Sequence, residues 1–213
     1  MLFAQNLFRR RNTIATRLAA KLFDQRLISN QFRTAYLVEM IEPVLRRYGW
    51  CATGELGSGW HFEHSGGCRL KVLQSAAIQS RPREHKLETR PVFGIRARGK
   101  SAPRDANGSS SSTLSSPDIY LIGWHPVLSV GRVDHRKPTQ WQFFVLPSRA
   151  LPQGQRTLGL ARVRELAGQE GDGAVSFSAL AGAIEGCRLR ARTETAVRAN
   201  EARLRSEPDC ALA

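Results

Sequence analysis

Long apolar runs are missing from this sequence of 213 residues. A membrane-spanning helix needs roughly 18 consecutive apolar residues or more, so we expect no membrane span and a cytoplasmic protein. The glycine-rich nucleotide-binding motifs G-x-x-x-x-G-K-[ST] and G-x-G-x-x-G do not occur, and neither does the nucleophile motif G-x-S-x-G. The sequence therefore lacks the signatures of P-loop and dinucleotide-binding proteins and of serine hydrolases.

Cysteine is scarce and poorly spaced for metal binding. The four cysteines, Cys51, Cys68, Cys187 and Cys210, form no C-x-x-C pair. Zinc sites use ligands clustered at short spacing, so we expect small reduced thiols rather than a zinc centre.

Acidic residues are also few: 18 Asp and Glu stand against 32 Lys and Arg, which gives a net charge of +14. Lysine occurs only five times, and the first 23 residues contain no acid at all. This balance predicts a polyanionic partner, with nucleic acid first and an anionic membrane surface second. The alternative is that a composition rich in arginine and alanine reflects codon bias.

Apolar spacing predicts how the chain is organised. Residues 1–28 are expected to form a basic amphipathic helix or extension, with the helix over residues 4–27. Residues 29–186 form the domain, and its first helix begins at Asn30 and is kinked or broken at Pro43. The polar segment 99–117 is predicted to be a disordered loop, and residues 187–213 a polar tail that is a frayed helix or disordered.

Strand signals follow the second predicted helix. They cover about residues 50–53, 59–64 and 68–75, then the apolar runs DIYLIGWHPV and WQFFVLP, and a short edge strand over 157–160. Helices are expected over residues 162–168 and 176–186. This order predicts an α/β fold in which helices flank both faces of a mixed central sheet.

The most informative segment is GWHFEHSGGCRLKVLQSAAIQS, from Gly59 to Ser80. It has the pattern of a β-hairpin that turns at Ser65-Gly66-Gly67. Polar or charged side chains alternate along one face, which carries His61, Glu63, Arg69 and Lys71, with Leu73 one step further.

Four segments between Ser29 and Gly186 resemble a bacterial branch of the PD-(D/E)XK superfamily, the restriction-endonuclease-like nucleases. They are the helix SNQFRTAYLVEMI with Glu39, the hairpin, the strands DIYLIGWHP and QWQFFVLP, and RTLGLARVREL. The resemblance implies an Asp on the first hairpin strand and an acid on the second that together hold Mg²⁺. It also implies a Lys two residues later that orients the attacking water.

The residues at these positions have changed. Alignment on the run that starts at Gln74 places His61 at the Asp position, Lys71 at the second acid and Leu73 at the lysine. Lys71 would repel Mg²⁺, and Leu73 cannot orient water. We therefore expect a catalytically degenerate nuclease-like domain without a cofactor. We expect it to bind nucleic acid non-specifically through phosphate contacts from Arg33, Arg69, Lys71, Arg81 and Arg83.

Two other functions remain open at this stage. One is an active Mg²⁺-dependent DNase with a rearranged site built from Glu63, Glu39 and Lys71. The other is a basic protein-interaction module whose basic helices dock an acidic partner or a membrane surface. The structural alternative for the hairpin is that Lys71 pairs with Glu63 across the two strands.

Three further polar sites have simpler interpretations. The triplet Asp134-His135-Arg136 precedes Pro138 and predicts a turn with a local ion pair. Asp118 is expected to anchor the start of a buried strand. His125 precedes Pro126 at a strand end, where it is a candidate to line a cleft.

Overall fold

The computed structural model describes residues 13–53, 59–79, 90–95 and 117–206, with side chains described up to residue 193. The helices are α2 (Ile14–Phe23), α3 (Asn30–Arg46), α4 (Leu160–Gln169) and α5 (Leu180–Ser206), with 3₁₀ turns η2 (Pro138–Gln140), η3 (Ser148–Ala150) and η4 (Phe177–Ala179). The strands are β1 (Trp50–Ala52), β2 (Phe62–His64), β3 (Arg69–Ala76), β4 (Val92–Gly94), β5 (Ile119–His125), β6 (Gln142–Pro147) and β7 (Thr157–Gly159).

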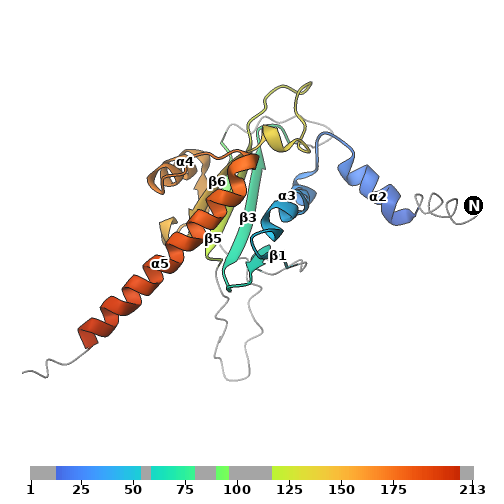
Figure 1. Ribbon diagram of the computed structural model, residues 1–213. Coiled ribbons are helices and arrows are strands. Elements are labelled where there is room, and N and C mark those ends of the chain that lie inside the picture. Colours follow the sequence, from blue (N-terminus) through green and yellow to red (C-terminus); the bar gives the residue numbers. More distant parts are fainter. Residues whose placement is uncertain (1–12, 54–58, 80–89, 96–116, 207–213) are drawn as a thin grey trace, which may run out of the picture.

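A five-stranded mixed sheet in the order β1-β2-β3-β5-β6 forms the centre of the molecule (Figure 1). The first three strands are an antiparallel meander, β3 pairs with β5 in parallel, and β5 pairs with β6 antiparallel. Strands β4 and β7 form a separate antiparallel pair. The predicted mixed sheet and the edge strand near residue 157 are confirmed.

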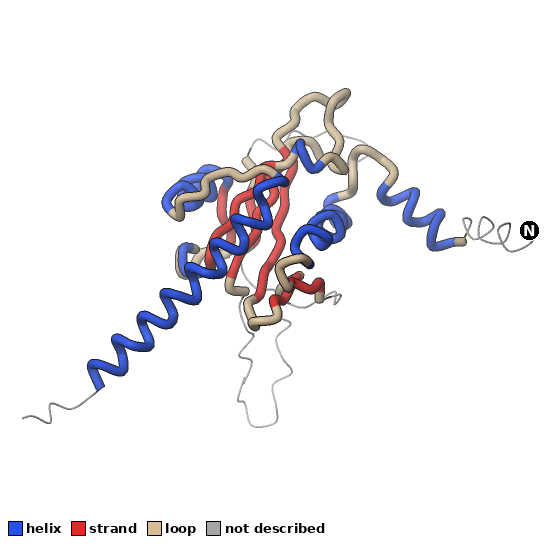
Figure 2. The backbone as a smooth tube through the Cα atoms, in the orientation of Figure 1, coloured by secondary structure: helices blue, strands red, loops and turns tan. Residues whose placement is uncertain are grey.

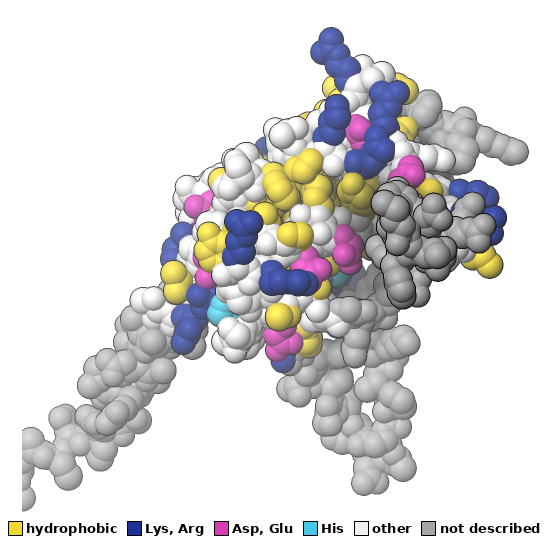
Figure 3. Space-filling model, turned by 45° about the vertical axis from the view of Figure 1, so that its right-hand side comes forward, with side chains coloured by type: hydrophobic (Ala, Val, Ile, Leu, Met, Phe, Trp, Pro, Cys, Tyr) yellow, Lys and Arg dark blue, Asp and Glu magenta, His cyan; other side chains and the backbone are white. Residues whose placement is uncertain are grey.

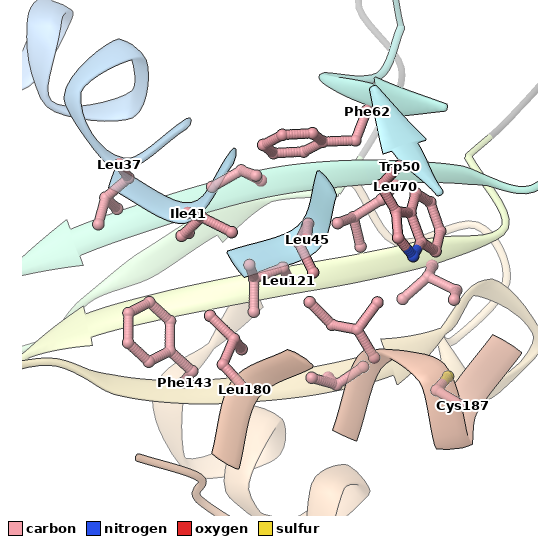
Figure 4. Packing of buried hydrophobic residues seen from close by; sticks show 14 of the residues in the cluster. Leu37, Ile41, Leu45, Trp50, Phe62, Leu70, Leu121, Phe143, Leu180 and Cys187 are labelled. Atoms are coloured by element: carbon pink, nitrogen blue, oxygen red, sulfur yellow. The ribbon is translucent and has the colours of Figure 1, made fainter. Parts of the chain in front are cut away.

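Helices cover both faces of this sheet, as the sequence predicted (Figure 2). On one face, α3 contributes Leu37, Ile41 and Leu45 to a core that also receives Leu180 and Ile184 from α5 (Figure 4). These residues recur every four positions, about one helical turn, so each helix turns one apolar stripe to the sheet. On the other face, α4 and the β4–β7 pair cover a second core.

Strand β5 lies in the middle of this arrangement, and all seven of its residues are buried. Its continuous apolar composition matches a strand covered on both faces. Gly123 allows the close packing, because a Cβ there would lie 3.3 Å from Leu37 Cδ1 and 3.4 Å from the Trp141 ring. A side chain at this position would therefore require Leu37 or Trp141 to shift by a few tenths of an ångström.

The amino-terminal helix is shorter in its described part than we predicted. Thr13 caps α2 by accepting a hydrogen bond from the Thr16 amide, and the helix ends at Phe23; residues 4–12 lie outside the described part. The residues just before the predicted boundary at 29 are joined to the domain, because Ile28 is completely buried. The Ile28 amide also donates to His135 Nδ1 at 3.0 Å.

A kink or a break was expected at Pro43, and the helix is not broken there. Helix α3 runs without interruption from Asn30 to Arg46 and contains Pro43. The proline is exposed, whereas the neighbouring Ile41 and Leu45 are fully buried. The burial of these two side chains holds the last turn in place although the proline removes one backbone hydrogen bond.

The first part of the predicted polar tail is an integral part of the domain. Helix α5 continues to Ser206, and Cys187 and Arg188 are buried. The Trp50 indole donates to Glu185 Oε1 at 2.6 Å, and Arg188 pairs with the same carboxylate at 2.8 Å. These contacts tie the start of α5 to β1, which charge patterning alone did not reveal.

Two other expectations concern segments away from the core. The predicted disordered loop lies, over residues 99–116, outside the described part of the chain. Within the described residues, no helix combines the length and apolar character needed to cross a membrane.

Candidate functional site

The predicted hairpin is present, but its two strands pair over a short distance. Phe62 faces Leu70 and Glu63 faces Arg69, and β3 then continues to Ala76 beyond the end of β2. On the β2 side, no described strand pairs with this part of β3. The motif positions therefore lie where β3 leaves its hairpin partner.

A pocket of about 590 Å³ opens beside this part of β3. Residues from three places line it: from the hairpin His61, Lys71, Val72, Leu73 and Gln74, from α3 Asn30 and Thr34, and from the β4–β7 side Val92, Phe93, Gly94, Arg156 and Thr157. Two of these side chains are cationic, and the described lining contains no Asp or Glu. The pocket therefore favours an anion over a metal ion.

His61 is held in one tautomer. Its Nδ1 accepts a hydrogen bond from the Val72 amide at 2.9 Å, so in the neutral ring the proton is on Nε2. Burial, with a smaller contribution from the Lys71 charge, lowers the pKa of His61 from 6.5 to about 4. At neutral pH this side chain is a hydrogen-bond donor without a free basic nitrogen, and it cannot act as a general base.

The other motif residues play different parts on β3. Lys71 and Leu73 lie on the same face, and Leu73 packs partly buried against the second core. Gln74 is a structural residue, because its Nε2 donates to Asn30 Oδ1 at 2.9 Å and its Oε1 accepts from Arg33. Of the three motif positions, Lys71 alone brings a cationic side chain to the pocket.

The two carboxylates of the rearranged-site hypothesis do not line this pocket. Glu63 lies opposite Arg69 and forms an ion pair with it at 3.7 Å, whereas the sequence suggested Lys71 as its cross-strand partner. Glu39 is exposed on α3. No group of three His, Cys, Asp or Glu side chains that could hold a metal occurs in the part of the chain that the structure describes.

Two of the predicted phosphate contacts are engaged within the protein. Arg69 pairs with Glu63 and also lies over the Trp60 ring at 4.2 Å. Arg33 is fully buried at the amino-terminal end of α3, so it cannot reach a phosphate at the surface. Arg81 and Arg83 lie outside the described residues. Of the predicted phosphate contacts, Lys71 lines the pocket.

The burial of Arg33 is compensated by oxygen atoms. Its Nη1 donates to Gln74 Oε1 at 3.0 Å, and its Nη2 to the Ile28 carbonyl and to Gln79 Oε1 at 3.2 Å each. Burial lowers the pKa of Arg33 from 12.5 to about 10. The side chain thus remains a cation at neutral pH and has a structural role beneath the pocket wall.

The remaining polar candidates prove to be structural. Asp134 and Arg136 form the expected ion pair at 2.9 Å, and Asp118 anchors β5 by accepting from the Arg69 amide at 2.8 Å. His125 was a candidate to line a cleft, but it is fully buried and packs edge-on against His135 at 4.8 Å. Burial lowers the pKa of both imidazoles, to about 4 for His125 and about 3 for His135.

Sequence reasoning missed the far wall of the pocket. Arg156 precedes the predicted edge strand, but its place depends on the pairing of β7 with β4, two strands of three residues each. Segment 90–95 carries no clear strand pattern, so its partner could not be assigned. The one signal in the sequence was a cationic side chain directly before the predicted edge strand.

In comparisons with known proteins, no protein-family model, curated protein or solved structure matches this chain. A fold by itself does not determine function. The function of this chain therefore has to be inferred from the chemistry of the pocket.

Proposed function

We propose that this chain is a catalytically degenerate PD-(D/E)XK nuclease-like domain that binds nucleic acid through phosphate contacts. The observation that carries the proposal is the pocket at the motif positions, lined by Lys71, Arg156 and His61 with its proton on Nε2. A phosphate is an acceptor of charge-assisted hydrogen bonds and matches this lining. A magnesium ion is usually held by carboxylate oxygens, and the described lining of the pocket contains no Asp or Glu.

The order of elements supports the nuclease-like assignment. Helix α3, the meander β1–β2–β3 and the buried strands β5 and β6 follow one another in the chain order on which the resemblance rests. The changed motif residues all lie at one place, at the end of the hairpin beside the pocket. We infer binding rather than turnover because His61 cannot accept a proton there and Leu73 cannot orient water.

Salt-dependent binding tests the proposal. We expect a single-stranded or duplex oligonucleotide to bind with an affinity that falls steeply as salt rises, because each neutralised phosphate releases counterions. The double variant Lys71→Gln, Arg156→Gln should bind more weakly and lower the slope of log K against log salt by about 1 to 2. Arg162→Gln is the matched control, since Arg162 pairs with Glu165 on α4.

Two results would contradict this proposal. A slope that does not change in the double variant would remove the pocket as the binding site. Heparin binding as tight as nucleic acid, with no effect of the pocket variants, would favour the basic protein-interaction module.

Cleavage assays separate the degenerate domain from an active nuclease. We expect no cutting of plasmid or single-stranded DNA by the wild-type chain with Mg²⁺ or Mn²⁺. The triple variant His61→Asp, Lys71→Glu, Leu73→Lys should cut, because it restores two metal ligands and the lysine. Metal-dependent cutting by the wild type that Glu63→Ala abolishes would instead establish the rearranged site.

A further inference from the structure

Helix α2 exposes an apolar face that the domain core does not use. It projects from the side of the domain beside α3, and none of its residues is buried (Figure 1). The side chains of Ile14 and Leu18, one helical turn apart, are 76% and 53% exposed. Arg17 and Lys21 are also one turn apart and flank this face, so α2 is a basic amphipathic helix.

The carboxyl end of α2 is fixed to the domain. Phe23 stacks on Tyr36 of α3 with ring centroids 5.8 Å apart. Just beyond it, Arg136 Nη1 donates to the Asp24 carbonyl at 2.5 Å, and Arg26 Nη1 donates to the Gly131 carbonyl at 2.9 Å. These hydrogen bonds join the end of the helix to the loop between β5 and η2.

That loop carries a second exposed apolar pair. Leu128 and Val130 are 64% and 51% exposed, and Arg132 and Lys137 on the same loop are exposed as well. Figure 3 shows basic side chains with hydrophobic ones among them at the top of the molecule, where this loop lies in Figure 1. Exposed apolar side chains therefore accompany basic ones on two segments that hydrogen bonds hold together.

We propose that α2 and the loop of residues 126–137 dock the protein on an anionic lipid surface. Aliphatic side chains insert at the boundary between head groups and acyl chains, while flanking Lys and Arg side chains contact anionic head groups. Nucleic acid would match the cations but would leave Ile14 and Leu18 in water. A second copy of the chain would cover the apolar face at the cost of bringing two molecules of charge +14 together.

This docking surface is separate from the pocket, so the two proposals fail independently. The test is co-sedimentation of the full chain with vesicles of phosphatidylcholine containing about 30% phosphatidylglycerol, beside vesicles of phosphatidylcholine alone. We expect binding to the anionic vesicles only. The double variant Ile14→Asn, Leu18→Asn keeps every charge and should bind them at least about tenfold more weakly, because it removes the inserting side chains.

Leu189→Asn is the matched control, because Leu189 on α5 is 54% exposed and lies outside this surface. It should leave vesicle binding unchanged, and both variants should leave oligonucleotide binding unchanged. A second readout does not depend on the double variant: Leu18→Trp should add fluorescence that brominated lipids quench.

The proposal is overturned if the double variant binds vesicles as well as wild type, or if brominated lipids do not quench the added tryptophan. Equal binding to neutral and anionic vesicles would also overturn it. A dimer in analytical ultracentrifugation that the double variant dissociates would show that a second copy covers the face instead.

Discussion

At the scale of single residues, the buried guanidinium of Arg33 is the most unusual feature. Three hydrogen bonds connect it to Gln74, Gln79 and the Ile28 carbonyl, and its Nε has no hydrogen-bond partner among the described residues. Within the same part of the chain no carboxylate pairs with it, so amide and carbonyl oxygens alone compensate the charge. These hydrogen bonds join α3 to the end of β3. They offset only part of the free energy that is needed to remove the guanidinium from water.

Substitutions at Arg33 should separate these two contributions. Arg33→Ala leaves a cavity and unpaired oxygens, and we expect it to lower the free energy of unfolding by about 2–4 kcal/mol. Arg33→Met fills much of the volume without a buried charge and should cost less than half as much. Urea unfolding of both variants measures the difference. An equal or larger loss for Met would mean that the hydrogen bonds outweigh the cost of burying the charge.

At the scale of elements, helix α3 contains a proline in its interior, Pro43, which neither donates a backbone hydrogen bond nor packs in the core. Pro43 has no N–H to donate toward the carbonyl of Glu39, and its side chain is exposed, so it contributes little packing. We expect Pro43→Ala to raise the free energy of unfolding by about 1–3 kcal/mol, because alanine restores the hydrogen bond and favours the helix. Thermal and urea unfolding test this.

A decrease in stability for Pro43→Ala would show that the helix depends on the shape the proline imposes. Glu42 lies next to it and pairs with Arg46, so Glu42→Ala is a suitable control for changes in this turn. That control should change stability by less than about 1 kcal/mol, since exposed pairs contribute little.

The elements that the sequence predicted well are those whose apolar pattern is long or continuous. The apolar residues Leu37 and Ile41, one helical turn apart, predicted the buried face of α3. The continuous apolar sequence of β5 predicted a strand that is buried on both faces. Strand β4 was missed because segment 90–95 carries no clear strand pattern and its partner β7 lies far along the chain. For the site, the alternation of side chains along the strands predicted that His61 and Lys71 lie close together, and both line the pocket. Arg33 was predicted to contact phosphate at the surface because it is charged, but it is buried.

At the scale of the whole molecule, three histidines make stability depend on pH. Burial lowers the pKa of His61, His125 and His135 from 6.5 to about 4, 4 and 3. The unfolded chain takes up protons below about pH 6.5 that the folded chain does not bind until lower pH, so acid favours unfolding. Stability is therefore highest above about pH 6.5 and is lost as the pH falls toward 4.

Each such histidine contributes up to about 1.4 kcal/mol per pH unit in this window. Urea unfolding at about pH 7.5, 6 and 5 should show the fall, and His125→Gln should reduce its slope by about one proton. Asp134 and Glu185 have lowered pKa values and act mainly below about pH 5, so they do not obscure the range above it. A stability that does not change over this range would contradict the buried, neutral state of these rings.

The parallel pairing of β3 with β5 also bears on how the chain folds. Leu70 lies opposite Ile119, and the Arg69 amide bonds Asp118 across 49 positions of sequence, whereas β5 and β6 follow each other directly as strands in the chain. Pairing β3 with β5 closes a longer loop than pairing β5 with β6 and therefore loses more chain entropy. We therefore expect the β5–β6 pair to form first. Higher φ-values for substitutions in β5–β6 than at the β3–β5 contact would show this order. The pocket beside β3 would then be assembled after the β5–β6 pair, together with the part of the core that α3 and β3 contribute.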